Sequence, residues 1–236
     1  MPAPDYRSAY LDALGITRWV RRDAPPVGSL GAGELGGAVS LLDDGGTEPD
    51  VAMLDWPGLR EKVLGCQGCD LCGTRTQVVF GVGDESADWL IVGEAPGEQE
   101  DLQGEPFVGR AGLLLNNMLA AVGLSRETVF IANVIKCRPP GNRDPGPREI
   151  EACLGYLHRQ IALIQPKMIL VVGRVAAQTL LQSDAPVGRL RGQVHTYEDV
   201  PLVVTYHPAY LLRRPVEKRK SWEDLKLAMS VFGCSR

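Results

Sequence analysis

The chain has 236 residues, a formal net charge of −4 and 44% hydrophobic residues, a composition that suits a packed globular protein and excludes a disordered one. No apolar run reaches the length of a transmembrane helix, and the first residues lack a signal-peptide pattern, so we expect a cytoplasmic protein. In that reducing compartment, six cysteines favour metal binding, catalysis or buried thiols over disulfides.

Charge is distributed unevenly along the chain. Residues 1–55 hold four basic and nine acidic residues, which leaves 21 basic and 20 acidic residues for 56–236. The basic residues of this second part gather between Lys136 and Arg148 and between Arg213 and Lys220. Such clusters are usually solvated surface, so by themselves they favour a nucleic-acid partner only weakly.

The amino-terminal region divides into two segments. Apolar residues within 1–23 recur at nearly helical spacing, which predicts either an amphipathic docking segment or a helix packed on the main domain. Residues 24–55 are rich in Gly, Pro, Asp and Ser without periodicity, as is typical of a flexible acidic linker. We therefore assign the folded domain to residues 56–236.

Strands and helices alternate in this domain. Short runs rich in β-branched residues predict strands at about 90–93, 129–135, 168–172 and 202–206. Amphipathic patterns predict helices at about 109–122, 147–165, 174–182 and 221–232. This order predicts an α/β fold, a three-layer α/β/α arrangement with a central, mainly parallel four-stranded sheet. Ligands bind beyond the carboxyl ends of such strands, where the loop starting at Glu94 is expected.

Four cysteines have the spacing of a metal centre. Cys66 and Cys69 form a C-x2-C pair, and Cys137 and Cys153 flank a loop rich in Pro and Gly. Four thiolates can hold tetrahedral zinc or a cubane iron–sulfur cluster, and the open second pair leans towards iron–sulfur. Cys72 leaves the identity of the first pair ambiguous. Buried inert thiols are a third possibility.

Six motifs of the domain are long and specific. They are Gly93-Glu-Ala-Pro-Gly97, Glu100-Asp101, Pro106-Phe-Val-Gly109, Ala111-Gly112, Asn133-Val-Ile-Lys-Cys-Arg-Pro-Pro140 and His207-Pro-Ala-Tyr-Leu-Leu-Arg213. Together they resemble the iron–sulfur uracil-DNA glycosylases, the fourth family of the uracil-DNA glycosylase superfamily. The resemblance implies a uracil-DNA glycosylase-like fold and a [4Fe-4S] cluster held by Cys66, Cys69, Cys137 and Cys153. It also implies hydrolysis of the N-glycosidic bond of uracil in double- or single-stranded DNA, without lyase activity. We expect a monomer.

Two residues are expected to carry the chemistry. His207 would hydrogen-bond to the departing base, and Glu94 would activate water or stabilise the sugar cation. In the best-studied sister family, the position of Ala95 holds an aspartate that polarises water, so its absence here moves that task to Glu94. The other histidines, His158 and His195, are expected to be structural or surface residues.

The resemblance implies binding residues as well. The base would be held by Gly93, Ala95, Glu100, Phe107 and Asn133. Phe107 would stack on the flipped uracil, Asn133 would read its edge, and Glu100 would exclude the methyl group of thymine. Contacts with DNA are expected from Arg138, Arg143, Leu211 and Arg213. The resemblance implies that an apolar residue of the His207 loop wedges into the gap left by the flipped base, and the sequence does not choose between Tyr210, Leu211 and Leu212.

Two other functions compete with a glycosylase. A branch of the superfamily that traps uracil-DNA covalently also carries the cysteines, but it has Gln at the position of Ala95 and a basic insertion after the phenylalanine motif. No such insertion lies between Phe107 and Leu115. A non-turnover uracil-DNA-binding or covalent-capture protein is thus the alternative to an enzyme. A zinc-stabilised nucleotide-binding protein is the third reading.

The amino-terminal segment resembles a different protein. Leu14-Gly-Ile-Thr-Arg-Trp-Val-Arg-Arg22 is similar to the start of the psi subunit of the bacterial DNA polymerase III clamp-loader complex, through which psi meets the chi subunit. This implies that residues 5–23 bind the chi subunit and raise the local concentration of the enzyme at replication sites. The glycosylase family ordinarily lacks such an extension.

Overall fold

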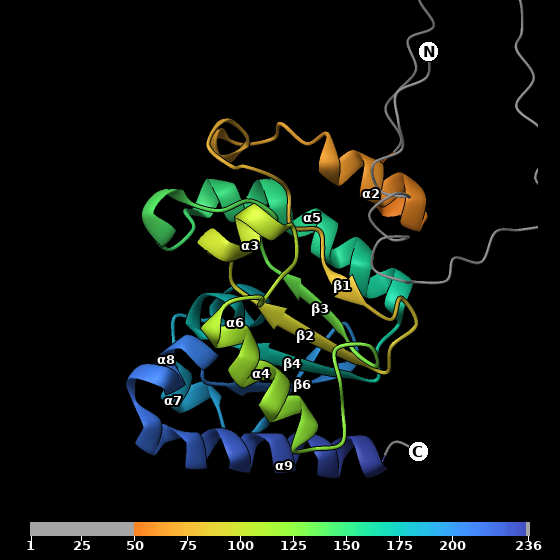
Figure 1. Cartoon of the computed structure of the whole chain (residues 1–236). Coiled ribbons are helices and arrows are strands. Elements are labelled where there is room, and N and C mark those ends of the chain that lie inside the picture. The colour runs from red at the N-terminus through yellow and green to blue at the C-terminus, as the bar shows by residue number, and fades with distance from the viewer. Residues whose placement is uncertain (1–49, 235–236) are drawn as a thin grey trace, which may run out of the picture. The chain divides into compact units, whose positions relative to one another are not determined.

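A six-stranded sheet forms the centre of the computed structural model, which describes residues 50–234 (Figure 1). In spatial order the strands are β1 (Val82–Gly83), β3 (Phe130–Asn133), β2 (Trp89–Gly93), β4 (Met168–Val172), β6 (Val200–Thr205) and β5 (Val194–Tyr197). The four inner strands are parallel, and β1 and β5 pair antiparallel at the edges. The predicted α/β class is confirmed, but the sheet has two more strands than the four expected.

The two additional strands lack the sequence pattern of buried strands. β1 has only two residues, and β5 alternates exposed and half-buried positions. β5 is joined to β6 by Glu198 and Asp199, whose φ angles of 46° and 64° are positive, as in a two-residue hairpin turn. Periodicity alone therefore detected the buried inner strands and missed these short edge strands.

Helices cover both faces of the sheet. The α-helices are α2 (Trp56–Leu64), α3 (Glu98–Gln103), α4 (Arg110–Ala120), α5 (Pro147–Ile164), α6 (Arg174–Leu181), α7 (Val187–Leu190), α8 (Pro208–Arg213) and α9 (Lys218–Cys234). Short 3-10 helices are η1 (Val51–Met53), η2 (Asp70–Gly73), η3 (Pro140–Asn142) and η4 (Pro215–Glu217). The four helices predicted from the sequence correspond to α4, α5, α6 and α9, with ends shifted by a few residues.

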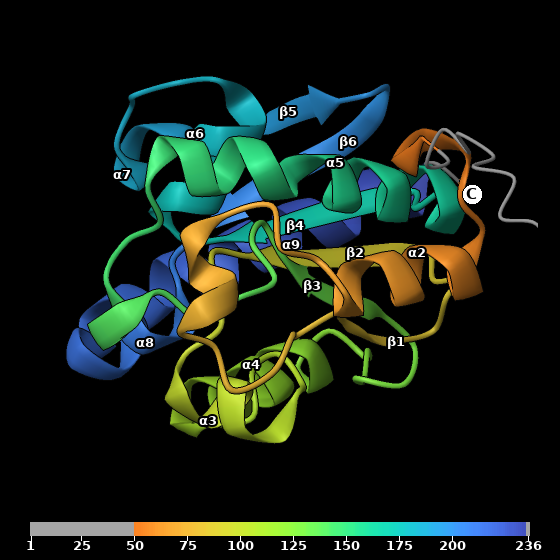
Figure 2. The ribbon, with the colours of Figure 1, turned by 90° about the horizontal axis from the view of Figure 1, so that it is seen from above.

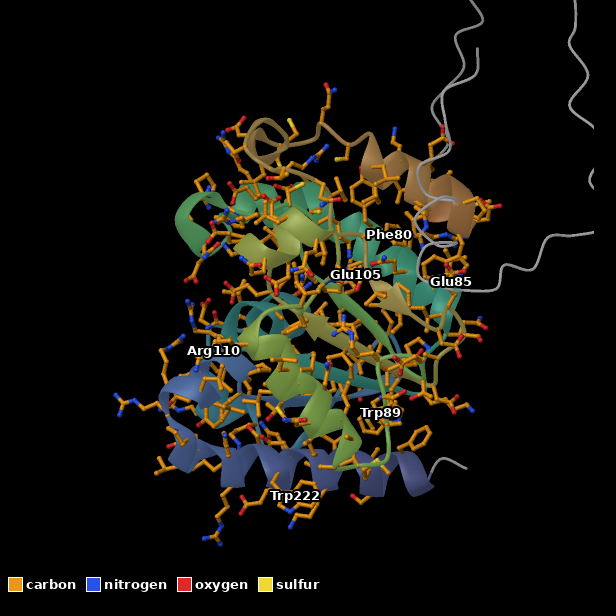
Figure 3. All side chains as sticks on the ribbon, viewed as in Figure 1. Phe80, Glu85, Trp89, Glu105, Arg110 and Trp222 are labelled. Atoms are coloured by element: carbon orange, nitrogen blue, oxygen red, sulfur yellow. The ribbon has the colours of Figure 1, made fainter. Side chains whose placement is uncertain are left out.

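Each face of the sheet has its own hydrophobic core. Helices α2, α5, α6 and α7 pack on one face, where Leu90 and Val92 point, and α4, α8 and α9 pack on the other (Figures 1 and 2). Trp89, labelled in Figure 3, belongs to the core on the second face. Its ring meets that of Phe232 in α9 edge to face, with ring centroids 5.6 Å apart. Successive residues of β2 thus point into opposite cores, as expected for a three-layer arrangement.

The folded domain includes residues that precede the predicted domain boundary. Residues 50–55, assigned from the sequence to the linker, include η1, and Val51 and Leu54 pack against the first core. The Leu54 carbonyl accepts a hydrogen bond of 2.5 Å from Nε of Arg159. The docking segment 1–23 and linker residues 24–49 lie outside the described residues. Within the described part, no helix is long and apolar enough to cross a membrane.

The two additional histidines lie at the β5 edge of the fold. His195 of β5 hydrogen-bonds through Nε2 to the Leu190 carbonyl at 2.7 Å. His158 of α5 meets the Tyr197 hydroxyl at 2.6 Å. Both therefore join neighbouring elements, the structural role expected of them.

The inner strands end together at one edge of the sheet. From β2 the chain passes to β3 on one side and later to β4 on the other, so the strand order reverses at β2. Ligands of open α/β sheets bind outside the strand ends at such a switch point. Glu94, Asn133, Gly173 and His207 follow or end β2, β3, β4 and β6 respectively. The chain segments that follow β2, β3, β4 and β6 therefore lie together at this edge of the sheet.

Candidate active site and thiol cage

A pocket of about 720 Å³ lies at this edge, within the range of small-molecule sites. Its lining brings together eight residues named from the sequence: Glu94, Ala95, Glu100, Phe107, Asn133, Arg143, His207 and Arg213. Gly93 lies against two of these side chains. Arg138 and Leu211 do not line the pocket.

Asn133 supplies a buried polar group to the pocket. The residue is 2% exposed, and its Oδ1 atom has no hydrogen-bond partner among the described residues. Such a buried acceptor costs about 1–3 kcal/mol unless a ligand donates to it. A Cβ atom at Gly93 would lie 2.4 Å from this oxygen and 2.7 Å from the Phe107 ring. Glycine is therefore required beneath the Asn133 amide and the Phe107 ring.

Phe107 has a backbone conformation that bulky residues rarely adopt, with φ of 55°. The Arg126 guanidinium donates to the carbonyl groups of Phe107 and Pro106, at 3.1 and 2.7 Å. A Cβ atom at Gly112 of α4 would lie 1.7 Å from the Phe107 carbonyl oxygen, so glycine permits the close approach. Strained residues persist where their surroundings fix them. Arg126 was not expected from the sequence, because its hydrogen-bond partners lie about 20 residues away along the chain.

Glu100 is fixed by backbone donors. Its Oε2 accepts a hydrogen bond from the amide of Gly97 at 3.1 Å. Its Oε1 accepts hydrogen bonds from the amides of Val108 and Gly109 at 3.0 and 3.3 Å. The side chain thus joins the loop after β2 to the loop that carries Phe107. It forms a rigid wall of the pocket.

His207 caps α8 and presents a neutral ring to the pocket. Burial, with Arg213 nearby, lowers its pKa to about 4, so the imidazole is uncharged at pH 7. Its Nδ1 accepts a hydrogen bond from the amide of Ala209 at 3.1 Å. In a neutral ring whose Nδ1 accepts, the proton is on Nε2. His207 therefore has an Nε2–H donor for a ligand, and its ring stacks on Phe107 at 5.6 Å between centroids.

Glu94 is the carboxyl group at the end of β2. Burial, reinforced by the Asp144 carboxylate and opposed by the Arg174 guanidinium, raises the pKa of Glu94 to about 7. Arg174 forms an ion pair with Asp144, and both of these side chains are more than half exposed. Both neighbours line the pocket. Neither neighbour was expected from the sequence, because Asp144 and Arg174 lie outside the motifs that carry the resemblance.

The three arginines expected to bind DNA differ in their surroundings. Arg213 is exposed at the pocket. Arg143 also lines the pocket, but both of its terminal nitrogens pair with Glu149, at 2.8 and 2.5 Å. Arg138 lies outside the lining and donates from Nε to Asn142 Oδ1 at 2.8 Å. Only Arg213 has no hydrogen bond or ion pair recorded among the described residues.

Leu211 is not placed to contact DNA directly. It is 1% exposed and packs in the second core beneath α8. Its neighbour Leu212 is 37% exposed, because adjacent helical residues point in different directions. A duplex could reach Leu211 only if α8 left the core, so this placement argues against the contact expected from the sequence.

The side chains of Cys66, Cys69, Cys137 and Cys153, here called the thiol cage, line one small cavity together with Cys72. All are free thiols. Burial raises the pKa of Cys153 to about 11, and a metal binding there would have to displace its proton. Within residues 50–234, no three ligand side chains converge closely enough for a single metal ion. The thiols instead surround the cavity.

Two cations lie beside the thiol cage. Arg75 donates to Cys137 Sγ at 3.0 Å and to the Cys66 carbonyl at 2.9 Å. Lys136 was assigned to a basic surface cluster, but it is 1% exposed and lines the cage cavity. Its Nζ donates to the Asn133 carbonyl at 2.9 Å and to a neutral glutamine side chain at 2.6 Å. Lys136 therefore connects the cage to the backbone of the pocket residue Asn133.

Several proteins similar to this chain are uracil-DNA glycosylases. Residues 80–226 match the family model of the Uracil DNA glycosylase superfamily. The chain is 47% identical over 180 residues to the Type-4 uracil-DNA glycosylase of Archaeoglobus fulgidus, covering 73% of this chain and 90% of the relative. The Type-4 enzyme of Sulfurisphaera tokodaii is 44% identical, with 71% and 80% covered. That of Thermotoga maritima is 42% identical, with 73% and 92% covered. The chain therefore belongs to the uracil-DNA glycosylase superfamily and, within it, to the type-4 uracil-DNA glycosylases.

Proposed function

We propose that the protein flips uracil out of DNA and hydrolyses its N-glycosidic bond, leaving an abasic site that starts base excision repair. The unpaired Asn133 Oδ1 is the observation that carries this proposal. Uracil has an N3–H donor beside the O4 acceptor, so one amide can pair with both groups. Neutral cytosine has no N3–H, and leaving the amide oxygen unpaired would cost about 1–3 kcal/mol.

Two further contacts select the base. Phe107 provides the aromatic face on which the flipped uracil stacks. Glu100 excludes the methyl group of thymine, and its three backbone hydrogen bonds support this role because they hold the carboxylate in place. Forcing a methyl group into a fixed wall typically costs about 1–3 kcal/mol.

His207 assists the departure of the base. When the bond between uracil N1 and the sugar C1′ breaks, the electron pair stays on uracil, and negative charge grows on its oxygens. The Nε2–H of His207 donates to that charge. One oriented donor of this kind is typically worth about 2.7–4 kcal/mol. Because the His207 imidazole is already neutral, it can donate from Nε2–H to the base without first changing its protonation state.

Glu94 acts on the other reactant, water. Its carboxylate accepts a proton from a water molecule as the water oxygen bonds to C1′, so a hydroxyl group replaces the base on the sugar. Its charge also stabilises the cationic character of the sugar in the transition state. Ala95 has no carboxylate for either task. Since the pKa of Glu94 is raised to about 7, the active carboxylate form increases as pH rises through that value.

Cys66, Cys69, Cys137 and Cys153 would hold a [4Fe-4S] cluster. Four thiols around one cavity fit a multi-atom cluster, and Arg75 and Lys136 supply cations beside its negative charge. When bound, such a cluster supplies a cross-link between the η2 region and α5 rather than reaction chemistry. Zinc, the alternative for four thiolates, is colourless, whereas an iron–sulfur cluster absorbs visible light.

The cellular setting follows from the same proposal. The enzyme works in the cytoplasm as a monomer, where reducing conditions keep the cage cysteines free of disulfides. Arg213 contacts DNA phosphate near the pocket. Residues 5–23 bind the clamp-loader chi subunit; this part rests on sequence resemblance alone, because that segment lies outside the described residues.

Incubation with defined oligonucleotides tests the activity. Strands with uracil, thymine or hypoxanthine opposite guanine are treated with alkali after incubation, which cleaves only where a base has been released. We expect cleavage at uracil and none at thymine. Asn133→Ala should lose most of this activity, whereas Asn117→Ala, at an exposed position of α4, should keep it. A uracil strand that is bound but never cleaved, or that stays attached to denatured protein, would instead indicate the capture protein.

A further inference from the structure

The guanidinium of Arg126 holds the backbone on both sides of Phe107. Arg126 lies between α4 and β3, and it donates to the Pro106 carbonyl at 2.7 Å and to the Phe107 carbonyl at 3.1 Å. These carbonyls belong to the two peptide groups that flank the Cα atom of Phe107. Since φ and ψ describe how those two planar groups are turned about the Cα atom, Arg126 fixes both dihedral angles of Phe107.

Glu100 holds the same segment through its amides. Its Oε1 accepts hydrogen bonds from the amides of Val108 and Gly109, at 3.0 and 3.3 Å. The peptide group between Phe107 and Val108 therefore has a cation at its carbonyl and a carboxylate at its amide, which is the arrangement that its dipole favours. Turning this peptide group would break a charge-assisted hydrogen bond at each end.

The conformation that these contacts hold is unfavourable for a phenylalanine by itself. Its φ of 55° is in the left-handed region, where a bulky side chain crowds the backbone. A phenylalanine free to relax would move to negative φ, and its ring would change direction. The ring now stacks on His207 and lies against the Gly93 backbone, so relaxation would alter the wall of the pocket.

We propose that Arg126 is a positioning residue for Phe107: it keeps the aromatic ring at the pocket by fixing the two peptide groups beside it. This inference rests on the proposed function, in which the flipped uracil stacks on Phe107. Arg126 is half-buried and outside the pocket lining, so it acts through the ring and not on the base. A guanidinium suits this task, because its rigid fork of N–H groups can donate to two carbonyl oxygens at once.

A double-mutant cycle on single-turnover excision tests this with the full-length, cluster-loaded protein. Phe107→Ala should slow excision from a uracil oligonucleotide by about 10- to 100-fold, because it removes the stacking surface. Arg126→Met should slow it by about 10-fold, because a ring displaced by a fraction of an ångström still stacks, but poorly. The double variant should be no slower than Phe107→Ala, since Arg126 then has no ring to position.

Inhibition by free uracil supplies a second measurement. Arg126→Met should weaken this inhibition by about the same factor as it slows excision, because the free base also stacks on the ring. Free uracil has no phosphate, so a lost contact with DNA cannot cause this change. Arg110→Met is the matched control, because it removes the same charge from an exposed position three residues after Phe107. It should leave uracil inhibition unchanged. Visible absorption and thermal melting show whether each variant is folded.

Several outcomes would overturn the inference. Arg126→Met could slow excision by the same factor with and without the Phe107 ring, which is the result expected of a purely structural residue. Unchanged inhibition by free uracil in Arg126→Met, or equal weakening in Arg110→Met, would contradict it too. So would equal rates for Phe107→Ala and the wild type, because the stacking role would then be absent.

A second substitution keeps the test decisive if Arg126→Met does not fold. Arg126→Lys keeps the positive charge and lacks the fork of donors, and it takes the place of Arg126→Met in the same cycle. If no folded variant of Arg126 slows excision, the inference fails. If the wild type itself releases no uracil, the proposed function fails instead.

Discussion

The polar groups of the thiol cage and those of the pocket differ in whether they have hydrogen-bond partners. In the cage, Cys137 Sγ accepts from Arg75, and Cys153 Sγ accepts from the Lys136 amide at 3.2 Å. In the pocket, Asn133 Oδ1 has no partner among the described residues, and the His207 ring keeps its Nε2–H for a ligand. Buried polar groups that have hydrogen-bond partners are typical of a structural scaffold. Buried polar groups without partners are typical of a site where a ligand supplies the partner.

Lys136 is where the two regions meet. Its amide contacts a cage cysteine, while its side chain donates to the carbonyl of Asn133. A buried cation whose hydrogen-bond partners are neutral is costly unless negative charge lies nearby, and a thiolate-ligated cluster would provide it. If the cage is a scaffold and the pocket a reaction site, changes in each should have different consequences.

The largest effect is expected from breaking the cage. Cys137→Ala removes one thiol and should abolish visible absorption and lower stability by several kcal/mol, because a bound metal centre contributes directly to folding. Absorption spectra and thermal melting measure both effects. Cys72→Ala is the matched control, since Cys72 lines the same cavity outside the proposed ligand set. A well-folded, colourless Cys137→Ala protein with rapid excision would contradict the scaffold role.

The next largest effect should come from the pocket alone. His207→Ala should slow single-turnover excision by about 100- to 1000-fold with unchanged visible absorption, because one oriented donor is lost. Loss of the α8 cap should lower stability by only about 1 kcal/mol. Since the pKa of His207 is lowered to about 4, protonation of this ring should not limit the wild-type rate until pH falls towards 4. His195→Gln, at the sheet edge, serves as control. Equal rates for His207→Ala and wild type would exclude the donor role.

A smaller effect is expected from a cation beside the cage. Arg75→Met removes the hydrogen bond to Cys137 and should lower stability by about 1–2 kcal/mol and speed the loss of visible absorption in air. Excision by the intact fraction should change little, because Arg75 is outside the pocket lining. Arg148→Met is the control, because it removes a positive charge from an exposed position of α5 by the same substitution. If Arg75→Met slows excision but preserves cluster stability, the division between the two regions is wrong.

The smallest effect on catalysis is expected at the amino terminus. Removal of residues 1–25 should leave excision from a short oligonucleotide unchanged, because all the pocket residues lie within 50–234. The same deletion should abolish capture of purified chi subunit by the immobilised protein. Equal capture by the full and shortened chains, or none by either, would dispose of the proposed docking role.

Sequence patterns predicted the parts of this molecule that are locally encoded. Inner strands such as β4 form continuous apolar runs, and Asn133 and His207 belong to motifs at strand ends. The ion pair between Asp144 and Arg174 could not be predicted this way, because folding brings the two residues together from a loop and a separate helix. The charged residues around Lys136 also led to a wrong prediction, namely an exposed side chain. Lys136 is buried because folding surrounds it with residues from other parts of the chain. For α8, sequence alone could not tell which of two adjacent leucines faces the core.

We infer that the chemistry takes place in the pocket, on the Glu94 carboxylate, while the thiol cage stabilises the fold. Glu94→Gln tests it most directly, because glutamine has nearly the same shape and cannot accept a proton from water. In cluster-loaded protein we predict single-turnover excision at least about 100-fold slower, with undiminished binding to uracil-DNA and unchanged visible absorption. An unchanged excision rate in that variant would contradict the account.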